Sequence, residues 1–96
     1  MTTARVRLND SVRVRLGAER GFLFDERTGR VYSLNASAAV AAAGLRDRQP
    51  SADVVAAVVD AFDVDAETAQ RDFARFVSHL VEEGLARVDD EQVQHG

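Results

Sequence analysis

The first third of the chain alternates apolar and polar side chains with a period of two. In residues 12–16 apolar positions alternate with two arginines, which predicts a strand with one apolar and one cationic face. Residues 21–25 (GFLFD) are apolar on both faces, so we expect a second strand that is covered on both sides. After a hairpin loop that ends at Gly29, residues 30–34 (RVYSL) form a third strand. Two short connections favour a three-stranded antiparallel meander.

From residue 35 the apolar period lengthens to 3.6, which is typical of amphipathic helices. Asn35, or alternatively Ser37, is a suitable N-cap for an alanine-rich first helix that ends near Gly44. Ser51 is expected to cap a second helix, which places four valines and Phe62 on one face.

A three-residue turn separates the second helix from a third. Asp65 caps this third helix, and Gly84 ends it as the residue beyond the C-cap. A short strand at 85–88 and a polar, frayed tail at 89–96 follow. The chain is therefore predicted to have an α+β fold that resembles a winged helix-turn-helix, with an N-terminal three-stranded antiparallel sheet followed by three helices.

Length and composition fit one small domain. The 96 residues, 46% hydrophobic and 29% charged, predict a single domain over residues 1–96 with an ordered core at about 6–88. No apolar stretch approaches the ~18–20 residues of a membrane span. The first ten residues also lack the apolar segment of a secretory signal, so we expect a cytoplasmic protein with no membrane partner.

Side chains that carry catalysis are nearly absent. The chain has no cysteine, which removes disulfides, thiolate catalysis and cysteine-based zinc sites. Its two histidines, His79 and His95, have no partner at metal-ligand spacing, and the glycines are spaced as turn residues rather than as a phosphate loop. We therefore expect a protein that is not an enzyme and has no cofactor, metal site or catalytic residue.

Because a helix-turn-helix commonly binds DNA, one candidate function is that of a winged-helix DNA-binding transcriptional regulator. The helix that would enter the DNA groove, residues 65–83, holds five acidic residues and two arginines, a balance of −3. This charge disfavours nucleic acid as a partner.

The strand at 30–34 offers a different kind of site. In a meander it is an edge strand with unpaired backbone groups, to which an extended peptide can add as a further strand. Alternatively, Arg30 and the short strand only protect this edge from aggregation. The residues alone leave both interpretations open.

Residues 22–38 (FLFDERTGRVYSLNASA) resemble the PqqD family, the peptide chaperones of pyrroloquinoline quinone biosynthesis. The family pattern is an apolar strand, then D-x-x-x-G-x-x-[YFW]-x-L-N, a small residue and the first helix. Later segments, FDVD at 62–65 and LVEEGL at 80–85, match the family's "F-x-V-D" and "L-x-x-x-G-L". The resemblance covers about residues 6–88. One departure is that the family's first helix commonly carries a large apolar pair such as Ile-Trp, where this chain has Val40 and alanines.

The resemblance implies a RiPP recognition element, a domain that binds the leader of a ribosomally synthesised, post-translationally modified peptide. The leader adds as a strand to the 30–34 strand and packs against the third helix. The domain then presents the core peptide to a modifying enzyme, often a radical S-adenosylmethionine maturase, or a leader peptidase in lasso-peptide systems. The resemblance therefore implies a non-catalytic chaperone whose partners are a precursor peptide and such an enzyme.

One flank of the third helix is the predicted second wall of the peptide groove. Around Phe73, the expected buried residues are Ala69, Val77 and Leu80, and the flank expected to pack on neighbouring structure is Gln70, Ala74 and Val81. On the groove flank, Phe76 would cover an apolar leader side chain and Arg75 would meet a leader acid, with Arg71 as an alternative contact. Alternatively, Phe76 is core and Arg75 is solvated. The predicted peptide-binding residues are Arg30, Val31, Tyr32, Ser33, Leu34, Asp72, Arg75, Phe76 and His79.

Overall fold

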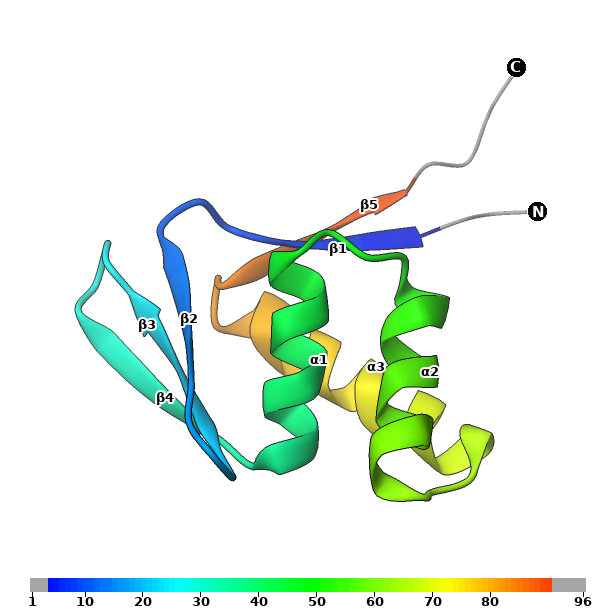
Figure 1. Cartoon of the computed structure of the whole chain (residues 1–96). Coiled ribbons are helices and arrows are strands. Elements are labelled where there is room, and N and C mark those ends of the chain that lie inside the picture. The colour runs from blue at the N-terminus through cyan, green and yellow to red at the C-terminus, as the bar shows by residue number, and fades with distance from the viewer. Residues whose placement is uncertain (1–3, 91–96) are drawn as a thin grey trace, which may run out of the picture.

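The computed structural model describes residues 4–90, which form two small antiparallel sheets and three helices (Figure 1). One sheet has the strand order β2-β3-β4, a meander of β2 (Val12–Leu16), β3 (Gly21–Asp25) and β4 (Arg30–Leu34). The other pairs β1 (Ala4–Leu8) with β5 (Ala86–Asp90). The helices are α1 (Ala36–Arg46), α2 (Ser51–Phe62) and α3 (Ala66–Glu82). The predicted α+β class, with its meander and three helices, is confirmed.

Helix α1 stands between the three-stranded sheet and the other two helices, with α3 crossing behind it (Figure 1). Each of β3, α1, α2 and α3 contributes at least one side chain to the centre of the core. The largest fully buried apolar side chains are Leu23, Leu45, Val54, Leu80 and Leu85.

The sheet is covered on one face only. Leu23 is fully buried, whereas Phe22 and Phe24 are 39% and 36% exposed. The prediction that residues 21–25 are covered on both sides is therefore wrong, because α1 packs on one face and none of the described elements packs on the other.

The pairing of β1 with β5 was not predicted. Residues 4–8 alternate apolar and cationic positions just as residues 12–16 do, so the signal for β1 was present in the sequence. The final strand runs to Asp90, so Asp89 and Asp90 do not belong to a frayed tail. The rest of the predicted tail, residues 91–96, lies outside the described residues, as does His95.

The predicted starts and ends of α1 and α2 are partly confirmed. Asn35 caps α1, where its Oδ1 accepts the Ala38 N–H at 2.9 Å. Ser51 is not the cap of α2, because the Asp53 and Val54 N–H groups donate to the carbonyl of Pro50, which makes Pro50 the N-cap. Gly44 does not end α1 but lies buried within it, where an added Cβ would stand 2.8 Å from a methyl group of Val54. This glycine allows the close approach of α1 and α2.

Both predicted ends of α3 are confirmed. The Asp65 carboxylate accepts the Thr68 N–H at 2.7 Å, and the hydrogen bonds from Thr68 lower the pKa of Asp65. Gly84 has a positive φ of 75°, and the next N–H, of Leu85, donates to the Leu80 carbonyl at 2.9 Å. This is a Schellman ending, in which a left-handed glycine lets the chain turn back.

The faces of α3 follow the prediction on one side. Ala69 and Leu80 are buried and Val77 is half-buried. The flank of Gln70, Ala74 and Val81, predicted to pack on neighbouring structure, is exposed, so that prediction is wrong.

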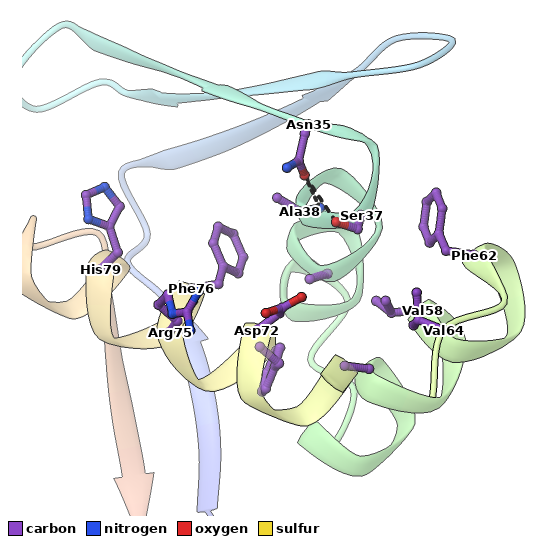
Figure 2. Close-up of a pocket in the computed structure, with 13 residues that line it drawn as sticks. Asn35, Ser37, Ala38, Val58, Phe62, Val64, Asp72, Arg75, Phe76 and His79 are labelled. Atoms are coloured by element: carbon purple, nitrogen blue, oxygen red, sulfur yellow. Dashed lines mark hydrogen bonds between the residues drawn. The ribbon is translucent and has the colours of Figure 1, made fainter. Parts of the chain in front are cut away.

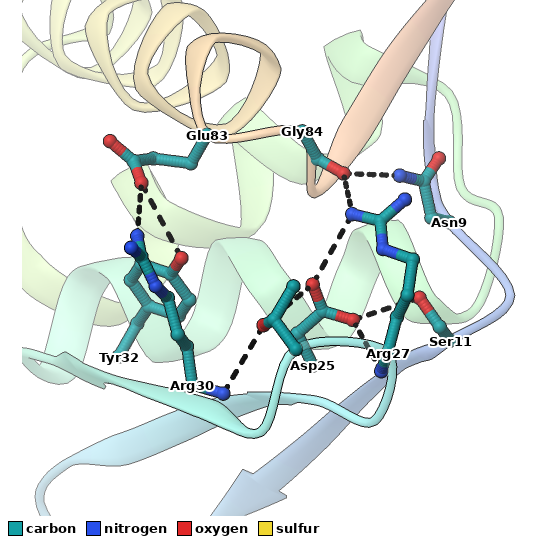
Figure 3. A network of polar contacts seen from close by, with 9 residues as sticks. Asn9, Ser11, Asp25, Arg27, Arg30, Tyr32, Glu83 and Gly84 are labelled. Atoms are coloured by element: carbon teal, nitrogen blue, oxygen red, sulfur yellow. Dashed lines mark hydrogen bonds and ion pairs between the residues drawn. The ribbon is translucent and has the colours of Figure 1, made fainter.

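A buried carboxylate ties the β3–β4 hairpin to the end of α3 (Figure 3). Asp25 is 1% exposed and accepts hydrogen bonds from the Ser11 hydroxyl and the Arg27 N–H, each at 3.0 Å. The Arg27 guanidinium reaches Asp25 at 3.3 Å and also donates to the Gly84 carbonyl at 3.2 Å. The Asn9 amide donates to the same carbonyl. This network fixes β4 relative to α3.

Burial raises the pKa of Asp25, but the hydrogen bonds from Arg27 and Ser11 and the Arg27 charge outweigh it, so the pKa lies below its usual value. A lowered folded-state pKa stabilises the fold fully above the unfolded value of about 4, and this contribution disappears as the pH falls further. We therefore expect the urea concentration at the midpoint of unfolding to decrease as the pH is lowered below about 4. This decrease should be smaller in Asp25→Asn. Asp60→Asn, at an exposed position of α2, is the control and should behave like the wild type. Equal acid slopes in the wild type and Asp25→Asn would contradict this role.

Candidate functional site

The direction of the β4 backbone groups follows from the register of the sheet. The Glu26 N–H donates to the Ser11 carbonyl at 2.9 Å, so the backbone of Glu26 faces β2. Backbone groups alternate sides along an antiparallel strand. Leu23 is three residues before Glu26, so its backbone groups face the opposite side, towards β4. Its register partner Tyr32 therefore faces β3.

Val31 and Ser33 therefore direct their backbone N–H and C=O groups away from the sheet. Among residues 4–90, no strand pairs with β4 on that side. Both side chains are exposed and lie on the outer face, whereas Tyr32 and Leu34 lie on the inner face towards the core. The edge of β4 thus has the unsatisfied backbone groups that an added strand requires.

A pocket of about 580 Å³ lies at the end of β4 between the three helices (Figure 2). Its apolar lining comes from Ala38, Ala41, Val58, Phe62, Val64, Ala69, Phe73 and Phe76. Its polar residues are Asn35, Ser37, Asp72, Arg75 and His79. Such a combination of apolar lining and a few polar groups is typical of ligand sites.

All four predicted residues of α3 line this pocket. Asp72, Phe76 and His79 follow one another at helical spacing on one face, with Arg75 beside them. Phe76 is half-buried and the other three are exposed. The structure therefore brings together the α3 residues that the sequence placed on one flank. Their role in peptide binding stays a prediction.

Residues of α1 and α2 that line the pocket were not predicted as site residues. The sequence identifies Asn35 and Ser37 only as candidate helix caps and Phe62 only as part of an apolar helix face, yet all three line the pocket. Apolar periodicity identifies a buried face but does not distinguish a packed core from the wall of a pocket.

A polar bridge connects β4 to Glu83, the C-cap residue of α3 (Figure 3). The Tyr32 hydroxyl lies 3.4 Å from a Glu83 carboxylate oxygen, and the Arg30 guanidinium lies 3.7 Å from the same oxygen. Glu83 was not predicted, although it is four residues beyond His79 and so continues the same stripe of α3.

The described residues show neither a metal site nor a membrane span. Within residues 4–90 no three His, Asp or Glu side chains are grouped so that they could hold a metal ion. None of the helices in this range is both long and apolar enough to cross a membrane.

Comparison with known proteins identifies the family. Residues 20–86 match the model of coenzyme PQQ synthesis protein D (PqqD). This chain belongs to the PqqD family. The resemblance noted from its sequence motifs is confirmed, and no curated protein matches the chain.

Two solved structures are similar to this PqqD-family chain. One is described as lasso peptide synthetase B1 complexed with the leader peptide; it is 32% identical, with a TM-score of 0.72, and the match covers 85% of this chain and 96% of that one. The other is TbiB1 in complex with the TbiA(beta) leader peptide; it is 21% identical, with a TM-score of 0.74, and the match covers 93% of this chain and 99% of that one. The second likeness concerns the fold alone. Neither match supports the DNA-binding alternative.

Within the PqqD family, the small residues of α1 are the departure noted from the sequence. Ala38 and Ala41 of α1 line the pocket, where larger apolar side chains would fill part of its volume. The same helix packs closely on α2 through Gly44. Small residues therefore serve two purposes in α1, close packing on one side and an open pocket on the other.

Proposed function

We propose that this chain binds the leader segment of a ribosomally synthesised precursor peptide and has no catalytic role of its own. The leader adds as a strand to the free edge of β4, packs on α3, and so holds the core peptide for a modifying enzyme. The observation that carries this proposal is the outward-facing backbone of Val31 and Ser33 beside a pocket on α3. Family membership and the likeness to a leader-peptide complex support it.

The backbone and the side chains of the site would contribute differently to leader binding. Hydrogen bonds to the β4 edge supply affinity that depends little on the leader sequence. Leader side chains on the inner face would lie about 5 Å from those of β4 and point towards α3. There Phe76 would cover an apolar side chain, and Arg75 would meet an acidic one.

The solved structure with the higher sequence identity supports one kind of partner enzyme. We propose a leader peptidase of a lasso-peptide system rather than a radical S-adenosylmethionine maturase, because the 32% identical structure is described as lasso peptide synthetase B1 complexed with the leader peptide. A single domain over residues 1–96 and a cytoplasmic location remain parts of the proposal.

A titration tests the central interaction. The protein is titrated into fluorescently labelled candidate leader peptides, and anisotropy is measured. The candidates are the N-terminal segments of any peptides encoded by short open reading frames beside this gene. We expect saturable binding of one segment that unlabelled leader displaces and duplex DNA does not. Displacement by duplex DNA, or no binding by any neighbouring segment, would contradict the proposal.

Proline at Val31 or Ser33 should weaken leader binding about tenfold or more, because proline removes the outward N–H and its ring obstructs the edge. Neither substitution removes a bond to β3, since both residues face away from it. Val31→Ala and Ser33→Ala retain the N–H and are the matched controls. If both proline variants keep their circular dichroism spectrum and bind the leader normally, strand addition to β4 is wrong.

Arg75→Glu should weaken leader binding by about 1–2 kcal/mol, the scale of a charge-assisted hydrogen bond at a partly wet interface. Its thermal midpoint should barely change, because Arg75 is exposed. Arg71→Glu makes the same charge change one turn away, outside the pocket lining, and is the control. If Arg71→Glu weakens binding and Arg75→Glu does not, the leader contacts the outer face of α3 instead.

A further inference from the structure

The bridge of Glu83 to Arg30 and Tyr32 lies at the opposite end of β4 from the pocket. The pocket includes Asn35, just beyond the C-terminal end of β4, whereas Arg30 is the first residue of that strand. Along α3, one side of the helix carries Asp72, Phe76 and His79 beside the pocket and continues to Glu83 beside Arg30. A strand that adds to the full length of β4 therefore passes from the pocket to this bridge.

At the bridge, β4 offers two donors and the C-cap residue of α3 supplies the acceptor. The Arg30 guanidinium and the Tyr32 hydroxyl converge on one Glu83 oxygen, at 3.7 and 3.4 Å. Arg30 and Tyr32 alternate with the residues whose backbone faces the free edge, so their side chains lie on the inner face that an added strand would share. A side chain of the added strand directly opposite one of these two residues would lie within about 5 Å of it. The other residue would then be its diagonal neighbour, at about 7–8 Å, which a long side chain can still reach.

The contacts of Glu83 are weak enough to be exchanged. Both distances are at the long end for such contacts, and the Arg30 and Glu83 side chains are 69% and 33% exposed. Exposed ion pairs contribute little free energy and are screened by salt. A peptide carboxylate at this position would meet the same two donors without leaving either unpaired.

We propose that Glu83 is a specificity-determining residue that takes the place of a peptide carboxylate in the free protein. The preferred peptide carries Asp or Glu opposite Arg30 or Tyr32, within reach of both side chains, and this carboxylate displaces Glu83 when the peptide binds. The proposal rests on strand addition to β4, and it adds a charge requirement at the end of the groove distant from the pocket.

A random-peptide display library provides the probe. Peptides selected on the wild type should share an acidic residue at one position, and those selected on Arg30→Glu should have a basic residue there. The acidic peptides should bind Glu83→Gln about two- to fivefold more tightly than the wild type, because the competing charge is gone. Peptides in which this acidic residue is replaced by its amide, Asn or Gln, should show a smaller difference in affinity between Glu83→Gln and the wild type.

The control is Glu82→Gln, which removes the same charge one residue away, outside both the bridge and the pocket lining. It should leave the affinity of the acidic peptides unchanged. Weaker or equal binding to Glu83→Gln, or an equal gain in Glu82→Gln, would overturn the proposal while leaving strand addition intact. The selected peptides are also tested against Val31→Pro and Ser33→Pro. If none of them binds these variants more weakly than the wild type, strand addition itself is wrong, and this proposal with it.

Discussion

The unsatisfied outer edge of β4 is the constraint on which this account depends. A strand edge exposes a row of donors and acceptors that pair readily with other chains. Here the outward groups belong to Val31 and Ser33, and no described strand covers them. Short length limits unwanted pairing, since β4 has five residues. The same edge is available to a peptide that also finds complementary side-chain contacts.

An edge alone would bind extended peptides without selection, so the position of α3 determines what the site can recognise. Two polar links hold the end of α3 against the sheet. One runs from Asp25 through Arg27 to the Gly84 carbonyl, and the other joins Glu83 to Tyr32. The first is buried at its carboxylate and the second is exposed, so they differ in how readily they exchange partners. The Asp25–Arg27 link thus holds α3 in place, whereas the Glu83 contact is the one that can be exchanged.

The features that sequence predicts well are those determined by neighbouring residues. Asn35, Asp65 and Gly84 stop or start helices through hydrogen bonds within a few residues, so their roles could be recognised from the chain alone. Ser51 is a preferred N-cap residue type and was predicted as the cap of α2, but the cap is the adjacent Pro50, which makes no side-chain hydrogen bond that the sequence could reveal.

Features that depend on distant segments were less predictable. Gly44 resembles a helix end in sequence, but its small size serves contact with Val54 of another helix. Phe22 and Phe24 are exposed because nothing described covers that face, which no local pattern reveals. The flank of α3 that lines the pocket could be predicted from helical spacing, whereas the contact of Glu83 with β4 required the fold.

Amide hydrogen exchange measured residue by residue, with and without bound leader peptide, tests the central claim most directly. If the peptide adds as a strand to β4, the Val31 and Ser33 amides should exchange rapidly in the free protein and become strongly protected in the complex. The Tyr32 amide, which faces β3, should be protected in both states. Saturating leader peptide that leaves the Val31 and Ser33 amides as unprotected as in the free protein would contradict the account.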